Sequence, residues 1–143
     1  MFSKTCEYAI RAMIYVAQQS KLDRRVSVKE VAEGIASPEY FTAKILQNLS
    51  RNNLLSSAKG PGGGFFLDKQ GLKAPLAEIV RIIDGDDIFT GCGLGLAQCS
   101  EIQPCPIHHE FKHIRKGIIS MLEKTKVGAF TEENSVHTLF LKR

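Results

Sequence analysis

The segment from Leu54 to Leu67, LLSSAKGPGGGFFL, constrains the fold of this chain more than any other stretch. Two short apolar runs flank a turn of four glycines and one proline, which is the pattern of a tight β-hairpin. The segment predicts a strand over residues 54–59, a turn over 60–64 and a return strand over 65–67. A phosphate-binding enzyme loop is the competing interpretation, but the turn lacks the Gly-Lys-Ser/Thr ending of a P-loop and does not open a helix.

Three helices are predicted ahead of this hairpin. An apolar stripe at three- and four-residue steps predicts the first helix over residues 3–20. Ser27 and Glu30 form a capping box that opens a short helix ending near Ile35. Ser37 as the cap and Pro38 at the first helical position start a third helix, which runs to Arg51. Three short helices followed by a glycine-tipped hairpin is the order of a winged helix-turn-helix.

The third helix has two different faces when it is projected at about 100° per residue. One arc is apolar and consists of Phe41, Ile45, Leu46 and Leu49. The opposite arc is small, polar and basic, and consists of Ala43, Lys44, Gln47, Ser50 and Arg51. Such a face suits a helix in a DNA major groove, although a solvated helix face would have the same composition. The hairpin that follows favours DNA, and the further predicted contacts are Ser27, Lys59 and the wing residues Gly60, Gly62 and Gly63, whose bare backbone can approach phosphates.

Length and composition exclude several classes of protein. A chain of 143 residues can bury one substantial core, and a second independent domain is not expected. The chain contains no apolar run of the roughly 18 residues that a membrane span requires. Its N-terminus has Glu7 and Arg11 within the apolar part and no small-residue cleavage site, which predicts a cytoplasmic protein. The net charge of +4 favours an acidic partner only weakly.

Three of the four cysteines are clustered at Cys92, Cys99 and Cys105, and His108 follows three residues later. Thiolates favour iron–sulfur clusters, Zn²⁺ and Cu(I). Structural zinc sites usually contain close C-x2–4-C pairs, and the spacing here is C-x6-C-x5-C. A glycine-bearing loop with this spacing suits a larger inorganic core, while zinc or a ligand-free thiol switch are the alternatives. Cys6 lies on an apolar helix and is predicted to be a buried core residue.

A fourth helix is predicted after Pro75, with Gly85 as its stop. After Pro106 an apolar seam with 4-3-4-3 steps predicts another helix, through Ile107, Phe111, Ile114, Ile118 and Met121. This seam is too short to be stable alone, so it packs either on its own domain or, as we prefer, on a partner helix. The expected fold is mainly α with a small β-wing. The expected division is a winged helix-turn-helix over 1–85, a cysteine loop over 86–106, a dimerisation helix over 107–126 and a tail over 127–143.

These features together resemble the bacterial winged-helix regulators typified by IscR and NsrR. The resemblance covers residues 1–125 and rests on EYAIRAM near the N-terminus, the wing sequence and the cysteine triplet before a long helix. It implies a homodimeric transcription factor with crossing C-terminal helices and an iron–sulfur cluster on Cys92, Cys99 and Cys105. It also implies a fourth ligand, either His108 or Glu7 of the partner subunit. Two departures are the x6 spacing in place of x5, which Gly93 and Gly95 can absorb, and Ala43 where IscR has an acid that discriminates between bases.

The sequence therefore predicts a non-enzymatic, homodimeric regulator that binds pseudo-palindromic promoter DNA. Its cluster, with [2Fe–2S] preferred over [4Fe–4S], would sense redox, nitric oxide or iron–sulfur status. One alternative is a cluster-free regulator that responds to cysteine oxidation or to a partner protein. A more remote alternative is a small iron–sulfur electron-transfer protein, which would leave the basic helix face and the wing unexplained.

Overall fold

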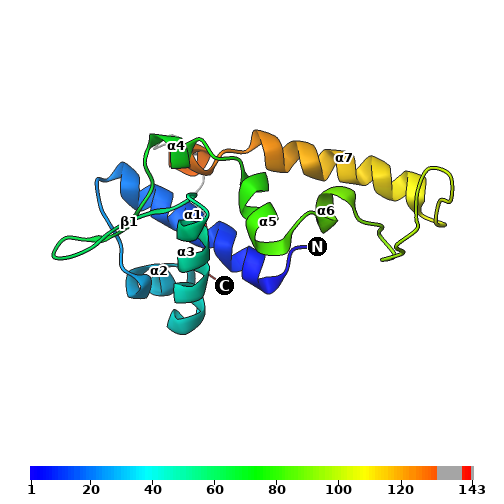
Figure 1. Cartoon of the computed structure of the whole chain (residues 1–143). Coiled ribbons are helices and arrows are strands. Elements are labelled where there is room, and N and C mark those ends of the chain that lie inside the picture. Colours follow the sequence, from blue (N-terminus) through cyan, green and yellow to red (C-terminus); the bar gives the residue numbers. More distant parts are fainter. Residues whose placement is uncertain (132–139, 143) are drawn as a thin grey trace.

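The computed structural model describes residues 1–131 and 140–142. It consists of helices and one two-stranded antiparallel sheet, which confirms the predicted fold class (Figure 1). The elements in chain order are α1 (Lys4–Lys21), α2 (Val28–Ile35), α3 (Glu39–Arg51), β1 (Ser56–Ala58), β2 (Gly64–Phe66), α4 (Lys69–Leu72), α5 (Leu76–Asp84), α6 (Asp87–Thr90), α7 (His108–Lys124) and the 3-10 helix η1 (Val127–Phe130).

The core surrounds α1, which contacts α2, α3, α5 and η1. The stripe predicted on α1 is buried: Ala9, Ala12, Met13, Val16 and Ala17 are all fully inaccessible to solvent. Cys6 lies in the same core, as predicted. Small alanines on this stripe allow neighbouring helices to approach closely, and the larger Met13 and Val16 fill the space between them.

Helices α2 and α3 form the helix-turn-helix. The Ser27 hydroxyl accepts the backbone N–H of Glu30 at 3.2 Å, which confirms the predicted cap of α2. Helix α3 begins at Glu39, one residue later than predicted, with Pro38 as its cap residue. The prediction that Ser37 caps α3 was wrong, because its hydroxyl contacts the side chain of Thr42 instead. Ile45, Leu46 and Leu49 are buried, as the projection predicted.

Strands β1 and β2 form the wing, with Ser57 opposite Phe65. Strand β1 is shorter than predicted, at three residues, whereas β2 has the predicted length but begins one residue earlier, at Gly64. Val26 pairs with Phe65 across the base of the wing and so attaches the hairpin to the loop between α1 and α2. At the tip, the N–H of Gly63 donates to the carbonyl of Gly60 at 2.9 Å and closes the turn.

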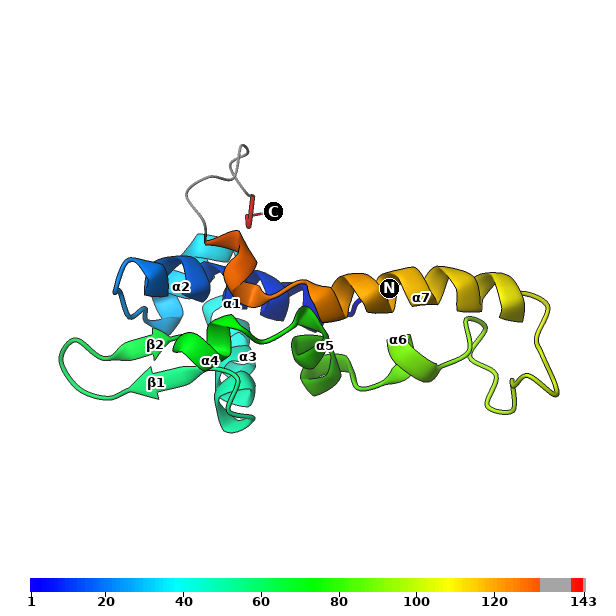
Figure 2. The same cartoon turned by 90° about the horizontal axis from the view of Figure 1, so that it is seen from above.

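Helix α7 projects from this body, and the wing projects in the opposite direction (Figures 1 and 2). Along α7 only Leu122, near the C-terminal end, is buried. The helix contacts α5 and α6. The short elements α4, α6 and η1 were not predicted. Of the predicted tail over 127–143, residues 127–130 form η1 against α1, whereas residues 132–139 and 143 lie outside the described residues.

Candidate functional site

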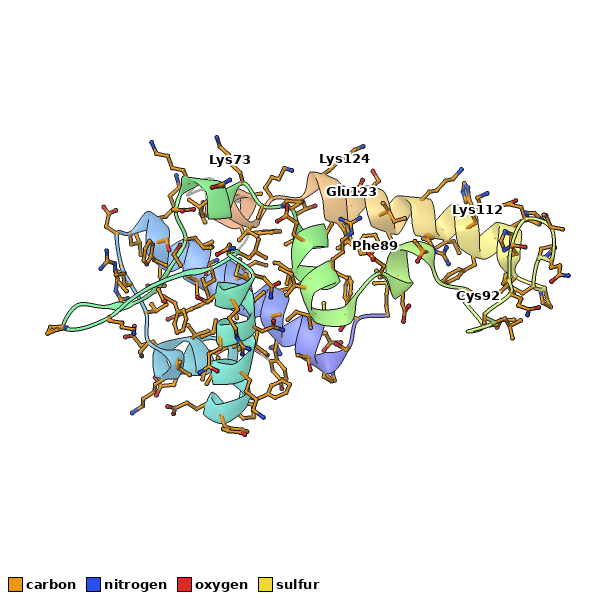
Figure 3. The ribbon with its side chains drawn as sticks, viewed as in Figure 1. Lys73, Phe89, Cys92, Lys112, Glu123 and Lys124 are labelled. Carbon is orange, nitrogen blue, oxygen red and sulfur yellow. The ribbon has the colours of Figure 1, made fainter. Side chains whose placement is uncertain are left out.

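The structure brings the three clustered cysteines together in the loop between α6 and α7. Their sulfur atoms all lie within 4.8 Å of one another, and Cys92 Sγ is 3.6 Å from Cys105 Sγ. Cys105 is buried, whereas Cys92 and Cys99 are half-buried. Figure 3 shows Cys92 on the loop that runs beneath the first turns of α7, near the end of the helix that carries Lys112. Three soft ligands at this separation can hold one metal centre.

His108, the first residue of α7, completes this group. Its Nδ1 is 3.1 Å from Cys99 Sγ, and its Nε2 is 3.1 Å from Glu101 Oε1. The Lys112 ammonium also contacts the Glu101 carboxylate. Lys112 and then His108 lower the pKa of Glu101 to about 2, so this side chain is a carboxylate under all ordinary conditions.

The pKa values of two thiols, those of Cys92 and Cys6, are shifted in opposite directions. The pKa of Cys92 is lowered to about 7, because the backbone N–H groups of Leu96 and Leu94 stabilise its thiolate. The N–H of Leu94 lies 3.3 Å from Cys92 Sγ. Burial raises the pKa of Cys6 to about 12, and the nearby Asp84 carboxylate adds to this effect. Cys92 is therefore a ready metal ligand or nucleophile, whereas Cys6 is an inert core thiol.

A cavity of about 350 Å³ lies among these side chains and also reaches Phe111 and Arg115 of α7. One terminal nitrogen of the Arg115 guanidinium donates to the carbonyl of Gly91, next to Cys92. The Nε of Arg115 is buried, and it has no hydrogen-bond partner among the residues that the structure describes. A buried donor without an acceptor is costly, so the cavity suits an anionic group such as a thiolate-bound iron–sulfur cluster.

The other predicted ligand, Glu7, lies elsewhere, whereas the neighbouring His109 lies beside His108, with one ligand atom each of Glu101, His108 and His109 within 4.8 Å of one another. Glu7 is in the first turn of α1, where its carboxylate is 3.0 Å from the Lys4 ammonium, and it is not among the residues that gather around the cysteines. A ligand role for Glu7 thus requires a second subunit, as the resemblance implies. His109 is exposed and contacts the His108 ring edge-on.

The residues predicted to contact DNA lie on α3, the wing and the start of α2. Lys44, Gln47 and Arg51 are exposed on α3, and Ala43 and Ser50 are half-buried beside them. Ser27, Lys59, Gly60 and Gly62 are exposed, and Gly63 is half-buried. The hydroxyl of Ser27 and the N–H of Gly63 already make the hydrogen bonds described above. DNA contacts by all ten residues remain predictions.

Two further residues on this surface, Tyr40 and Arg25, were not predicted from the sequence. Tyr40 is 74% exposed, and Lys44 Nζ lies 4.6 Å above its ring. The projection of α3 contained the signal, because Tyr40 falls in the same arc as Gln47 and Arg51. Arg25 lies with its guanidinium 4.9 Å from the ring of Phe66 on the wing. Only the Val26–Phe65 pairing brings Arg25 to the wing, so no local pattern could have indicated it.

Comparison with known proteins assigns this arrangement to a family. Residues 2–133 match Rrf2, described as an iron-dependent transcriptional regulator. The chain belongs to the Rrf2 family. This Rrf2 protein is 33% identical over 129 residues to a candidate HTH-type transcriptional regulator from Aquifex aeolicus, an alignment that covers 89% of this chain and 88% of the relative. It is 24% identical over 129 residues to the HTH-type transcriptional regulator IscR of Klebsiella pneumoniae, covering 90% of this chain and 78% of IscR.

Solved structures agree on the fold of this Rrf2 protein. CymR, the global cysteine regulator of B. subtilis, superposes with a TM-score of 0.73 at 18% identity, covering 92% of this chain and 98% of CymR. IscR of T. potens superposes with a TM-score of 0.72 at 20% identity, covering 96% of this chain and 93% of IscR. At these identities the likeness establishes the winged-helix fold, and what the cysteine loop binds depends on its own residues.

The family and its relatives confirm the predicted resemblance and the absence of an enzymatic role. This Rrf2 protein is a DNA-binding transcriptional regulator with a cysteine group that could bind metal. Within the described residues, no helix is both long and apolar enough to span a membrane.

Proposed function

We propose that this Rrf2 protein is a cytoplasmic, homodimeric regulator that couples an iron–sulfur cluster to promoter binding. The observation that carries the proposal is the convergence of three thiols within 4.8 Å, with His108 Nδ1 beside Cys99. A similarity to IscR and the buried Arg115 Nε support the same ligand class. Membership of a family of transcriptional regulators argues against the alternative of a small iron–sulfur electron-transfer protein.

Cys92, Cys99 and Cys105 would hold the cluster, with His108 or the partner's Glu7 as the fourth ligand. Mixed histidine and cysteine ligation occurs in Rieske-type [2Fe–2S] centres, which favours [2Fe–2S] over [4Fe–4S] here. When bound, such a cluster supplies a redox-active group that reacts with oxygen and nitric oxide. The chain itself supplies the thiolates, the nearby cations Lys112 and Arg115, and a cavity of about 350 Å³ among these side chains.

Dimerisation through α7 would place two α3 helices against successive major grooves of a pseudo-palindromic site. The exposed apolar side chains of α7, which include Ile114 at 58% and Met121 at 48% exposure, support such a contact. A solvent-facing apolar stripe on a projecting helix is the usual mark of an interface.

Coupling between cluster and DNA would operate through the junction of α5, α6 and α7. Cys92 lies two residues after α6, and Cys105 lies three residues before α7, so a bound cluster would fix these helices relative to each other. Arg81 on α5 connects them to the DNA-binding body, because its guanidinium lies 4.1 Å from the Phe89 ring of α6 and 3.7 Å from Glu123 of α7. If one arrangement of these helices binds the cluster better, cluster binding would favour that arrangement. The spacing of the two α3 helices in the dimer would then change with it.

The test is to purify the full chain without oxygen and to measure its visible absorption, iron and acid-labile sulfide. Binding of the chain to its own promoter DNA is then measured before and after cluster removal. We expect stoichiometric iron and sulfide and a change in affinity on removal. A colourless protein that refuses reconstitution, or an affinity that does not change for any natural promoter, would contradict the sensing role.

A thiol switch without a cluster is the second candidate, and two observations favour it. Cys92 Sγ lies 3.6 Å from Cys105 Sγ, and the Cys92 thiolate is well populated near pH 7. Treating the iron-free protein with hydrogen peroxide and mapping disulfides by mass spectrometry separates the candidates. A Cys92–Cys105 disulfide that changes DNA affinity, in a protein that takes up no iron, would establish the switch.

A further inference from the structure

The ring of His108 is held from both sides, and this arrangement determines which of its nitrogen atoms is available. Nε2 lies 3.1 Å from Glu101 Oε1, and an ionised carboxylate can only accept a hydrogen bond. The proton of a neutral His108 therefore resides on Nε2. Nδ1 keeps its lone pair and points toward Cys99 Sγ at 3.1 Å, inside the thiol group.

We propose that Glu101 is a positioning residue that presents Nδ1 of His108 as the fourth ligand of the cluster. The fourth ligand then comes from the same chain as the three thiolates and not from Glu7 of the partner. This inference rests on the proposed function, because it assigns a role within the cluster site. A carboxylate behind a metal-binding histidine fixes the tautomer and the ring orientation, and it raises the basicity of the ligating nitrogen.

Lys112 keeps Glu101 in this position. His108 and Lys112 lie one turn apart on α7, so both face the loop that carries Glu101, and the Lys112 ammonium contacts the same carboxylate oxygen as His108 Nε2. The side chain of His108 is only 16% exposed, whereas that of Glu101 is 60% exposed. An exposed ion pair contributes little to folding stability, so the contact serves to orient the ring.

Glu7 fits this role less well. Its carboxylate lies 3.0 Å from the Lys4 ammonium on α1, and it is not among the residues that gather within 4.8 Å around the cysteine sulfurs. To act as a ligand it would have to reach the cysteine loop of the other subunit. His108 already faces Cys99 within the same chain, so its ordering cost on metal binding is smaller.

The test uses the full chain, reconstituted without oxygen with iron and sulfide, and labelled with ¹⁵N-histidine. Pulsed electron paramagnetic resonance of the reduced cluster reports a coordinated histidine nitrogen directly. We expect this coupling in the native chain and its loss in His108→Ala. In Glu101→Ala we expect the cluster to be lost to a chelator about 10- to 100-fold faster, the range typical of removing such a partner.

Two further variants separate positioning from general charge or folding effects. Glu101→Gln keeps an oxygen that accepts from Nε2–H, so we expect its chelator rate to return most of the way to the native value. Glu110→Ala removes the same charge from an exposed position in the first turn of α7 and is expected to match the native chain. In the metal-free native protein, ¹⁵N nuclear magnetic resonance should show His108 protonated at Nε2, and Glu101→Ala should produce a mixture of tautomers.

The outcomes also distinguish a failure of this inference from a failure of the proposed function. A chain that takes up no iron and sulfide overturns the proposed function and this inference together. A stable cluster without histidine coupling, which is lost in Glu7→Ala, overturns only the inference and assigns the fourth ligand to the partner. Histidine coupling with equal chelator rates in Glu101→Ala and Glu110→Ala would overturn the role of Glu101.

Discussion

Replacing Ile114 by alanine should weaken the proposed dimer without unfolding the chain. The structure divides the predicted seam of α7 into two sets. Phe111 and Ile118 face their own chain, since Phe111 packs against Gly93 of the cysteine loop and Ile118 packs on the core. Ile107, Ile114 and Met121 are 39%, 58% and 48% exposed and lie seven residues apart, so they form one straight stripe that faces solvent.

The size of the effect follows from the exposure of Ile114. Burying an isoleucine fully contributes about 1.5–3 kcal/mol, so covering the exposed half contributes about 1 kcal/mol per copy. A two-fold interface contains every residue twice, and the substitution should therefore cost the dimer about 2 kcal/mol. This corresponds to an increase of about 30-fold in the dimer dissociation constant.

Sedimentation equilibrium over a range of protein concentrations measures that constant, and circular dichroism verifies the helical content. Lys116→Ala is the matched control, since Lys116 is exposed on the opposite face of α7. Dissociation constants for Ile114→Ala and Met121→Ala that stay within a factor of two of the native chain would refute the reasoning. The stripe would then have another function, and dimerisation would have to use a different surface.

Four other predictions concern stability, thiol reactivity and DNA. Leu122→Ala should lower the free energy of unfolding by about 2–5 kcal/mol, measured by urea denaturation, because Leu122 is the buried residue that attaches α7 to the core. In the reduced, iron-free protein, alkylation of Cys92 should accelerate as the pH rises through about 7, whereas mass spectrometry should find buried Cys6 unmodified until the chain unfolds. Arg51→Ala and Lys59→Ala should each reduce the salt dependence of DNA binding by about one unit of slope, with sequence preference unchanged. Tyr40→Ala should instead alter the preferred sequence by about 1–3 kcal/mol at one base pair, as seen in competition binding.

Local patterns predicted the elements whose signals are local. The serine cap at Ser27, the stripe on α1 and the arc on α3 each arise from neighbouring residues, and the structure contains all three. The grouping of the cysteines was predicted because three thiolates in a glycine-bearing loop suit one inorganic centre, as the family resemblance also implied. The four-residue helices α4 and α6 were not predicted, because one helical turn contains too few residues to show a hydrophobic period.

Features that depend on distant contacts could not be predicted from the sequence. Glu101 is an ordinary loop acid in the sequence, and its contacts with His108 and Lys112 become visible only where the loop returns to α7. The first cysteine spacing is one residue longer than in the resembling family, and we expected Gly93 and Gly95 to absorb that residue. Gly95 adopts a φ of +71°, and its N–H donates to the Cys92 carbonyl at 2.9 Å, so the additional residue is absorbed in a turn.

The junction at Arg81 is the route by which, in the proposed function, a loop at one end of the molecule would affect a helix at the other. The Arg81 guanidinium is 3.4 Å from Asp86, which precedes α6, and 3.7 Å from Glu123 on α7, and these side chains are 43–70% exposed. Exposed ion pairs of this kind contribute little energy each. The body is well packed, and α7 is attached to it by the buried Leu122, by Ile118 against the core and by these weaker contacts. In the proposed coupling, a reorganised loop would change the angle at this junction while α1, α2 and α3 move as one unit.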